Sequence, residues 1–529
     1  MALSIKHLTI SIGKHELLLD ESVGIVDGSK VGLIGRNGVG KTTFLQAILG
    51  QVDYLGSIEF NGKAAYFSQH IDLDPDKTVQ QTLGESAPIH HQGDFEEELK
   101  AIELQLADPA NHQPGNAARL SKLTDRYVEL QAKLGEPEKP RSTSKIKSVL
   151  RTLEVQESWL EKSIGSLSTG QRAIIALAQI LSSGADFLLL DEPTNHLDFK
   201  RLEILENYLR AFKGTVLMVT HDRYFLDRVC DTILKIEKGK WTKYRGNYSD
   251  YVKTREAAFE AQKTAYRLEN KYLAMQRDKI ARIGKSPAKV KQGQYRERLL
   301  EKREVVEKPD LDQSQFKTRF EASPIHGPVV LELKDLTVGY DKPLISHINL
   351  NVGADQRIIL IGENGMGKST LFKTIEGRVP ALSGEVILDQ EGKLGYADQE
   401  LKDLSTHATL YDEIYALLKD LGKTRQNLSM MGFVEDAEVF KPISQLSMGE
   451  KSRLNLLKVL IEKPNLLLLN EPTNHLDIDA REIIENAFLN YDGAIFAVSH
   501  DRYFIHKIAQ RVLVVRDGTI NELEMKKPG

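Results

Sequence analysis

The sequence of 529 residues contains a single cysteine, Cys230, and no apolar run long enough to cross a membrane. One cysteine excludes an intramolecular disulfide and a metal site built from several thiolates, as is typical of proteins from a reducing compartment. A membrane-spanning helix needs about 18 consecutive apolar residues. The segment from Met1 to Lys14 also lacks the basic start and the apolar centre of a secretion signal. We therefore expect a cytoplasmic protein.

An excess of charge of one sign is also missing, because the formal net charge is only −4. Such a balance creates no overall basic field that would attract nucleic acid, so any site of that kind must be local. Hydrophobic residues make up 41% and charged residues 28% of the chain, which is typical of a folded protein. At about 150 residues per domain, the length predicts three or four structural units.

Several short motifs occur twice, in the same order and at matching distances. The pairs are GRNGVGKTT from Gly35 and GENGMGKST from Gly362, LSTGQ from Leu167 and LSMGE from Leu446, and THDRYF from Thr220 and SHDRYF from Ser499. A fourth pair, FLLLDEPTNHLD from Phe187 and LLLLNEPTNHLD from Leu466, differs at Asp191, which Asn470 replaces. Repeated motifs at fixed spacing indicate a duplicated domain.

The duplication predicts four parts of the chain. We expect a first domain at 1–245, a linker at 246–327, a second domain at 328–520 and a short tail at 521–529. The first copy is about 51 residues longer than the second before its LSTGQ motif. This surplus predicts a helical insert at about 85–160. The insert is either an enlarged helical subdomain without a separate task or a dedicated docking arm.

The linker concentrates positive charge. Residues 251–308 carry 16 Lys and Arg against 8 Asp and Glu. Apolar residues recur every seven positions at Val252, Phe259, Tyr266, Leu273 and Ile280, which places a narrow apolar stripe along a helix of some 32 residues, about 48 Å long. Residues 283–287, IGKSP, predict a turn, and a second helix with Tyr295 and Leu299 on its own stripe follows. The pattern predicts an antiparallel helical hairpin.

Both copies of the first motif fit the phosphate-binding loop G-x-x-x-x-G-K-[ST], and each follows an apolar strand and opens a helix. The glycines allow successive backbone N–H groups to face phosphates at the positive end of the helix. Lys41 and Lys368 are placed to reach the β- and γ-phosphates of a nucleotide. Thr42 and Ser369 are placed to ligate Mg²⁺.

The fourth motif begins with four apolar residues, which predict a buried strand that ends in a polar residue. Doubly wound α/β sheets bind their ligands at this end of the strands. Asp191 is placed to hold magnesium through its water shell, and Glu192 to orient or deprotonate an attacking water molecule. His221 and His500 also end apolar strands, each 29 residues after the glutamate of its copy, and we interpret them as functional.

The motifs LSTGQ, DEPTNHLD and THD of the first copy, and LSMGE, NEPTNHLD and SHD of the second, resemble the nucleotide-binding domains of ATP-binding-cassette proteins. Two such domains in one chain, with a basic helical hairpin between them, resemble the F subfamily of that family. Its members are cytosolic ATPases that act on the ribosome. The resemblance covers nearly the whole chain and implies an α/β protein of two P-loop domains that hydrolyses ATP with Mg²⁺.

The resemblance also implies that the two domains of a monomer close on each other, head to tail, over two ATP molecules. One site would then use Gly35, Asn37, Gly38, Gly40, Lys41, Thr42, Thr43, Gln69, Asp191, Glu192 and His221 with Ser447 and Gly449 of the other domain. The second site would use Gly362, Asn364, Gly365, Gly367, Lys368, Ser369, Thr370, Gln399, Glu471 and His500 with Ser168 and Gly170. Gln69 and Gln399 would join the metal ligands.

The basic hairpin corresponds to the linker that similar proteins insert into the exit-tRNA site of the ribosome, towards the peptidyl-transferase centre. Near its predicted tip lie Arg277, Lys279, Arg282, Lys285, Lys289, Lys291, Arg296 and Arg298. Such a tip suits a cavity lined by the phosphates of ribosomal RNA and tRNA. A solvated charged helix face is the alternative interpretation.

Two positions depart from the family pattern. An aromatic residue normally stacks on adenine, and Tyr340 fits this role in the second copy, but Ile12 occupies the matching position of the first. Asn470 keeps the size of an aspartate but lacks its charge. Because Glu471 is still present, we expect the second site to bind ATP and to hydrolyse it more slowly than the first.

The expected function is that of an ATPase on translating ribosomes, which either clears stalled complexes or displaces antibiotics. Two alternatives stay open. The chain could be the ATPase subunit of a membrane transporter, which would need a separate membrane partner. It could also be a nucleic-acid repair ATPase whose hairpin reads DNA shape.

Overall fold

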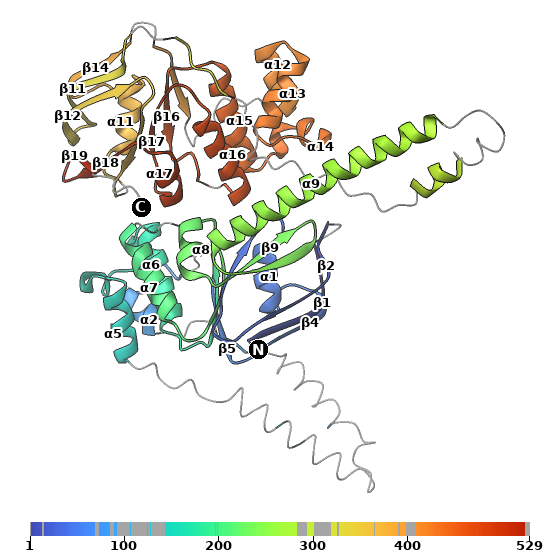
Figure 1. Ribbon diagram of the computed structural model, residues 1–529. Helices are drawn as coiled ribbons and strands as arrows, with labels where there is room; N and C mark the ends of the chain where they lie inside the picture. The colour runs from blue at the N-terminus through green and yellow to red at the C-terminus, as the bar shows by residue number, and fades with distance from the viewer. Residues whose placement is uncertain are drawn as a thin grey trace. The chain divides into compact units, whose positions relative to one another are not determined.

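A computed structural model describes residues 2–12, 15–68, 73–84, 89–91, 106, 124, 127, 143–195, 197, 199–282, 294–300, 319–324, 327–363, 365–389, 392–397, 408–474 and 476–523. The chain forms two compact units, Met1–Tyr248 and Ser249–Gly529. Each unit has its own sheets and its own hydrophobic core, so the predicted α/β class with a duplicated domain is confirmed (Figure 1). Most of the helical insert that we expected at about 85–160 lies outside the described residues.

The larger sheet of the first unit contains β3 (Lys30–Ile34), β5 (Lys63–Phe67), β6 (Ile89–His91), β7 (Phe187–Asp191), β8 (Thr215–Val219), β9 (Thr232–Glu237) and β10 (Lys240–Arg245). Their order is β10-β9-β3-β8-β7-β5-β6, and the five central strands run parallel. Every residue of β3, β7 and β8 is buried. Such continuous apolar strands are typical of a parallel sheet covered on both faces.

A second, antiparallel sheet consists of β1 (Leu3–Ile12), β2 (His15–Ile25) and β4 (Leu55–Phe60), in the order β2-β1-β4. Helix α1 (Lys41–Ile48) shares one core with both sheets, because Phe44 and Leu45 pack with Leu8 of β1 and Leu189 of β7. The helix that follows the phosphate loop is therefore anchored in the hydrophobic core of the unit.

The remaining helices of the first unit are α2 (Val79–Gly84), α5 (Thr143–Thr152), α6 (Thr169–Leu181), α7 (Phe199–Ala211) and α8 (Arg223–Val229). Short 3-10 turns occur at Glu157–Trp159 and Ile164–Ser166. Helix α6 is buried without interruption from Ala173 to Leu181, and α2 and α5 pack against it.

The second unit repeats this arrangement. Its larger sheet contains β13 (Arg357–Ile361), β15 (Leu394–Ala397), β16 (Leu466–Asn470), β17 (Ala494–Val498), β18 (Arg511–Arg516) and β19 (Thr519–Leu523), in the order β15-β16-β17-β13-β18-β19. Its antiparallel sheet contains β11 (Val329–Gly339), β12 (Pro343–Gly353) and β14 (Ser383–Leu388). The helices are α11 (Lys368–Ile375), α12 (Leu410–Leu418), α13 (Leu421–Met430), α14 (Asp436–Val439), α15 (Met448–Ile461), α16 (Ile478–Leu489) and α17 (Arg502–Ile508).

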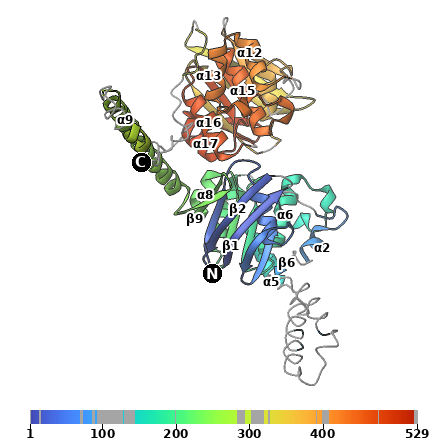
Figure 2. The same ribbon diagram turned by 90° about the vertical axis from the view of Figure 1, so that its right-hand side faces the viewer.

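Helix α9 (Tyr248–Ala281) is the first helix of the predicted linker. It contains 34 residues, which corresponds to a length of about 51 Å. Figures 1 and 2 show it as one continuous helix. The residues of the predicted stripe, Val252, Phe259, Tyr266, Leu273 and Ile280, are all half-buried. In the part of the chain that the structure describes, no helix is both long and apolar enough to pass through a membrane.

The predicted turn at 283–287 lies outside the described residues, and residues 294–300 are helical. Tyr295 and Leu299, which we expected on the apolar stripe of the second linker helix, are 64% and 52% exposed. Both side chains thus lie on a helix, as expected, with more than half of each exposed to solvent.

Each unit buries a carboxylate on the helix that follows the DEPTNHLD-type motif. Glu206 of α7 lies 3.3 Å from Arg228 Nε of α8, and Glu485 of α16 lies 3.0 Å from Lys507 Nζ of α17. A buried carboxylate loses its hydration, so a nearby cation is needed to offset that cost. The same ion pair in both units therefore fixes two neighbouring helices against each other.

We expect Lys507→Met to destabilise the second unit by about 2 to 3 kcal/mol, because Glu485 would stay buried without the ammonium group that Lys507 supplies. The double variant Glu485→Gln, Lys507→Met should recover most of this loss, since a neutral amide replaces the carboxylate. Urea unfolding of the full chain measures both effects. A single variant as stable as the unchanged protein would contradict the prediction.

Candidate nucleotide-binding sites

Each phosphate loop joins a buried strand to a helix, β3 to α1 in the first unit and β13 to α11 in the second. Gly40 and Gly367 directly precede the helices with left-handed backbone angles, φ 99° and φ 90°. An added Cβ would come within 2.8 Å of Leu17 in the first loop and of Leu344 in the second. Only glycine combines this backbone conformation with so little space.

The loop lysines are held by the loops themselves. Lys41 Nζ donates to the carbonyls of Gly35 and Arg36, at 2.8 and 3.1 Å. Lys368 Nζ donates to the carbonyls of Gly362 and Glu363, at 2.6 and 2.8 Å. Burial lowers the pKa of Lys368, although the nearby carboxylates of Glu471 and Glu363 act in the opposite direction. Both ammonium groups therefore already lie at the loop that would surround the phosphates.

The other residues predicted for the two phosphate loops differ in how far they are exposed. Gly38, Asn37, Gly365 and Ser369 are exposed, Gly35, Thr42, Thr43 and Gly362 are half-buried, and Thr370 is buried. Asn364 lies outside the described residues, as do Gln69 and Gln399.

The glutamate of each motif has an unusual backbone conformation. Glu192 and Glu471 have φ 51° and φ 50°, a left-handed conformation that side chains other than glycine, asparagine and aspartate rarely adopt. Their N–H groups donate to the carbonyls of Val219 and Val498, at 2.8 and 2.9 Å. A strained residue that the neighbouring strand holds in place is a frequent feature of functional sites.

The predicted histidines lie beside these glutamates. The backbone N–H of His221 donates to Glu192 Oε2 at 3.4 Å, and that of His500 donates to Glu471 Oε2 at 3.3 Å. The ring Nε2 lies 3.3 Å from Glu192 Oε1 in the first unit and 3.5 Å from Glu471 Oε1 in the second. The structure thus brings each predicted Glu–His pair together.

Burial raises the pKa of Glu471 to about 7. The backbone N–H of His500 and the positive charges of Lys368 and Arg481 act against this shift, while Asp501 adds to it. A carboxyl group with a pKa near neutrality can exchange a proton with water under physiological conditions. Its Oε1 atom is buried and accepts no hydrogen bond from the described residues, so it has capacity to accept one from a bound water molecule.

The metal-binding prediction rests on the last residue of β7 and β16. Asp191 is fully buried, and Tyr66 OH donates a hydrogen bond to its Oδ2 at 3.4 Å. Asn470 is half-buried, and Ser369 Oγ donates to its Oδ1 at 3.5 Å. Oxygen atoms of this kind are the ligands that Mg²⁺ prefers. Ser369 with Asn470 therefore suits a magnesium ion, but without the charge that Asp191 supplies in the first unit.

The serines of the LSTGQ and LSMGE motifs cap helices. Ser168 Oγ accepts from Gln171 N at 3.3 Å before α6, and Ser447 Oγ accepts from Glu450 N at 3.2 Å before α15. In both cases the serine N–H donates to the side chain of the third residue after it, Gln171 or Glu450, which completes a capping box. Both serines are exposed, with Gly170 and Gly449 in the first turn. These helix ends are suited to an anion.

Tyr340, the predicted adenine-stacking residue, follows β11 and is 60% exposed. Its counterpart Ile12 ends β1. An exposed aromatic ring is available for stacking, whereas an isoleucine provides only an aliphatic surface.

The predicted RNA-binding residues lie at the end of α9 and beyond it. Arg277, Lys279 and Arg282 are exposed, and Arg282 pairs with Asp278 at 2.7 Å. Arg296 and Arg298 are exposed in the helical residues 294–300. Lys285, Lys289 and Lys291 lie outside the described residues.

Sequence reasoning missed two contacts at these sites. Tyr66 lies on β5, which pairs with β7, and its hydroxyl contacts Asp191. A tyrosine three residues before Gln69, repeated as Tyr396 before Gln399, was the available signal. The second missed contact is the ion pair between Arg481 and Asp501, for which a single arginine in a helix gives no signal.

Comparison with known families agrees with this geometry. The family model described as "ABC transporter" matches residues 18–195 and 345–474, and a second model of the same description matches residues 234–320. The duplicated fold and the two phosphate-loop sites define an ATP-binding-cassette ATPase.

Similar proteins extend over the whole chain. Putative ATP-binding protein YdiF of Bacillus subtilis is 34% identical over 99% of this chain and 81% of its own length. ABC transporter F family member 2 of Arabidopsis thaliana is 35% identical over 95% of this chain and 74% of its own length. Energy-dependent translational throttle protein EttA of Mycobacterium tuberculosis is 32% identical, over 96% and 90%. The chain belongs to the F subfamily of the ATP-binding-cassette family.

Solved structures support the fold. The archaeal ribosome recycling factor aABCE1, in its complex with the ribosomal stalk protein aP1, is similar with a TM-score of 0.58 at 18% identity. The match covers 97% of this chain and 89% of that one. At this identity the similarity establishes the shared fold.

We expect the site of the first unit to hydrolyse ATP faster than that of the second. Asn470 lacks the charge that helps to hold Mg²⁺, and part of Glu471 is protonated near neutral pH. Glu192→Gln should therefore reduce single-turnover hydrolysis by about tenfold more than Glu471→Gln does. Asn470→Asp should bring the hydrolysis rate of the second site closer to that of the first. A larger loss in Glu471→Gln would show that the order is reversed.

The raised pKa of Glu471 also predicts a pH-dependent effect on stability. Folding raises this pKa from its ordinary 4.5 to about 7, so the folded protein holds the proton more tightly than the unfolded chain. The carboxyl group therefore opposes folding increasingly as the pH rises from about 4.5 to about 7, and it has no such effect below that range.

Glutamine does not titrate, so Glu471→Gln should stabilise the nucleotide-free protein at about pH 8, by at most about 3 kcal/mol. This gain in the free energy of unfolding should be smaller at about pH 5.5. Denaturant unfolding at the two pH values measures it, and the exposed Glu435→Gln is the control that should show no such difference. Equal gains at both pH values would contradict the raised pKa.

Proposed function

We propose that this ATPase binds the ribosome at the exit-tRNA site and acts on tRNA or the peptidyl-transferase region through its linker. The observation that carries the proposal is the segregation of charge on the linker. Residues 251–308 carry 16 basic against 8 acidic residues in a chain of net charge −4. A long helix with exposed Arg277, Lys279 and Arg282 towards its end suits a deep cavity lined by phosphates.

The two units bind ATP between the phosphate loop of one and the serine-capped helix of the other. Two features support this part of the proposal. Each unit carries both half-sites, and the capping serines Ser168 and Ser447 are exposed. ATP would then favour the closed arrangement of the two units, and hydrolysis would remove that preference.

Within each site, the loop lysine and the helix end bind the phosphates, and the glutamate orients the attacking water molecule and accepts its proton. The histidine beside it fixes the carboxylate and contacts the γ-phosphate. Thr42 and Asp191, or Ser369 and Asn470, would hold Mg²⁺ together with Gln69 or Gln399. The bound ion would neutralise charge on the phosphates.

One relative supports the link to translation, since the M. tuberculosis protein is named an energy-dependent translational throttle protein. The competing proposal is the ATPase subunit of a membrane transporter, which the description of the family model would suit. A long basic helix has no evident task in a transporter. Under the ribosomal proposal, the protein has one of two tasks, the rescue of stalled ribosomes or the displacement of an antibiotic.

We expect the double variant Glu192→Gln, Glu471→Gln to sediment with ribosomes in the presence of ATP, because it would bind ATP without hydrolysing it. Reversing the charge at the end of α9 with Arg277→Glu, Lys279→Glu and Arg282→Glu should abolish this co-sedimentation and leave ATP binding intact. Sedimentation through a sucrose cushion at two salt concentrations measures the effect.

The matched control reverses three exposed basic residues nearer the start of the same helix, Lys253→Glu, Arg267→Glu and Lys271→Glu. It should weaken binding less, because these residues lie farther from the predicted tip. Failure of the double variant to sediment with ribosomes would favour the transporter or the repair ATPase. Equal loss in both triple variants would contradict a role specific to the tip.

A further inference from the structure

In the second unit, Arg481 contacts the loop that carries His500. No arginine occupies the corresponding position of the first unit. Arg481 lies in the first turn of α16. The corresponding residue of α7, at the same distance from its motif, is Leu202, which is buried. The side chain of leucine cannot donate a hydrogen bond, so Leu202 cannot form the contact that Arg481 makes.

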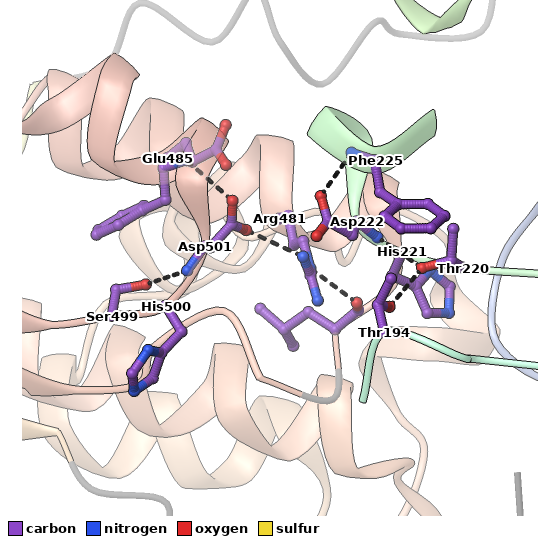
Figure 3. Close-up of polar contacts among 12 residues, drawn as sticks. Thr194, Thr220, His221, Asp222, Phe225, Arg481, Glu485, Ser499, His500 and Asp501 are labelled. Carbon is purple, nitrogen blue, oxygen red and sulfur yellow. Dashed lines mark hydrogen bonds and ion pairs between the residues drawn. The ribbon is translucent and has the colours of Figure 1, made fainter. Parts of the chain in front are cut away.

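Arg481 bridges two segments of the second unit. Its Nη1 lies 3.0 Å from Asp501 Oδ2, and its Nε donates to the carbonyl of Leu476 at 3.1 Å, as Figure 3 shows for the arginine and the aspartate. The side chains of Arg481 and Asp501 are only 14% and 9% exposed. A largely buried pair with charged partners holds its geometry more firmly than an exposed one. The neighbouring Glu482 pairs with Arg255 of α9 instead.

The local structure of the histidine loop does not require Arg481. Asp501 Oδ1 caps α17 by accepting from Phe504 N at 3.0 Å, and Asp501 N donates to Ser499 Oγ at 3.1 Å. The first unit has the same two bonds at Asp222, with Phe225 at 2.9 Å and with Thr220 at 3.1 Å. What Arg481 adds is the connection from this loop to α16 and to Leu476 near the end of the NEPTNHLD motif.

The first unit makes its connection in another way. Thr194 Oγ1 lies 2.7 Å from Thr220 Oγ1, which joins the segment after Glu192 directly to the residue before His221 (Figure 3). Thr473 and Ser499 occupy these places in the second unit, and between these two described residues there is no such hydrogen bond. The arginine therefore takes the place of the threonine pair.

We propose that Arg481 is a positioning residue for ATP hydrolysis in the second unit, where it fixes the loop that holds His500 against Glu471. The backbone N–H of His500 donates to Glu471 Oε2 at 3.3 Å, so a shift of the loop would turn the carboxylate away from the attacking water molecule. Binding of ATP rests mainly on the phosphate loop and the serine-capped helix end, so we expect it to be unaffected. Loss of Arg481 therefore lowers kcat and leaves KM unchanged. The inference concerns hydrolysis by the isolated protein and does not depend on ribosome binding.

The test replaces Arg481 by the residue of the first unit. Arg481→Leu should lower kcat of the full chain, and in the Glu192→Gln background it should lower the residual rate about fivefold with KM within about twofold. Arg481→Lys, which keeps the charge, should retain at least about half of the rate. Adding Asp501→Asn, which preserves the helix cap, should cause no further loss in Arg481→Leu if the two residues act as one pair.

Arg511→Leu is the matched control, because Arg511 also forms an ion pair, with Glu522 at 2.8 Å, but lies on β18 at the opposite end of the strands from His500. It should lower the thermal midpoint without lowering kcat. Unchanged hydrolysis in Arg481→Leu in both backgrounds would overturn the proposal. So would a loss of kcat that Arg511→Leu reproduces, or a loss that Arg481→Lys does not relieve, since either would reveal a purely structural effect.

Discussion

In each unit the candidate site depends on one backbone hydrogen bond, donated by the N–H of the glutamate to the carbonyl at the end of the neighbouring strand. This bond joins Glu192 to Val219 and Glu471 to Val498. It continues the parallel pairing of the two strands by one residue and holds the glutamate in a left-handed conformation that turns its side chain towards the histidine loop. Because the next strand leads directly into His221 or His500, the same bond brings the glutamate and the histidine together. The geometry of the site is thus a property of strand pairing, which a buried apolar sheet specifies strongly.

The two copies keep this arrangement but differ in the contacts around it. The first unit has a charged, fully buried Asp191 in contact with Tyr66, and a pair of threonine hydroxyls that ties the histidine loop. The second has Asn470 in contact with Ser369, and an arginine ion pair that ties the loop. Each difference changes one group next to the glutamate without altering the strands. Duplication of the domain therefore allows the chemistry of one site to be adjusted while the fold of both is maintained, because Asp191 and Asn470 are the last residues of their strands and the threonines and Arg481 lie beyond the strands.

The parts that sequence reasoning predicted are those that short patterns determine. Glycine spacing predicted both phosphate loops, apolar runs predicted the strands that end at Asp191 and Asn470, and a seven-residue period predicted α9, whose 34 residues compare with the expected 32 or so. The left-handed backbone at Glu192 and Glu471 could not be predicted, because a glutamate gives no local sign of such a conformation. The pair of Arg481 and Asp501 was also beyond reach. Its residues are 20 positions apart, on a helix and a loop that only the packing of α16 beside α17 brings together.

The phosphate loops add a constraint on how nucleotide binding proceeds. Lys41 and Lys368 each donate hydrogen bonds to two carbonyls of their own loop. A phosphate oxygen can replace one of these carbonyls as an acceptor. Both lysines are buried, and a buried ammonium group left without acceptors would be costly. The loop carbonyls offset that cost. On binding, a charged phosphate replaces a neutral carbonyl as the acceptor. This exchange lowers the free energy, because charge-assisted hydrogen bonds are about twice as strong as neutral ones. Since the two loops are held in the same way, this step is common to both sites, and the expected difference in their rates arises after binding, at Asn470, Glu471 and the loop that holds His500.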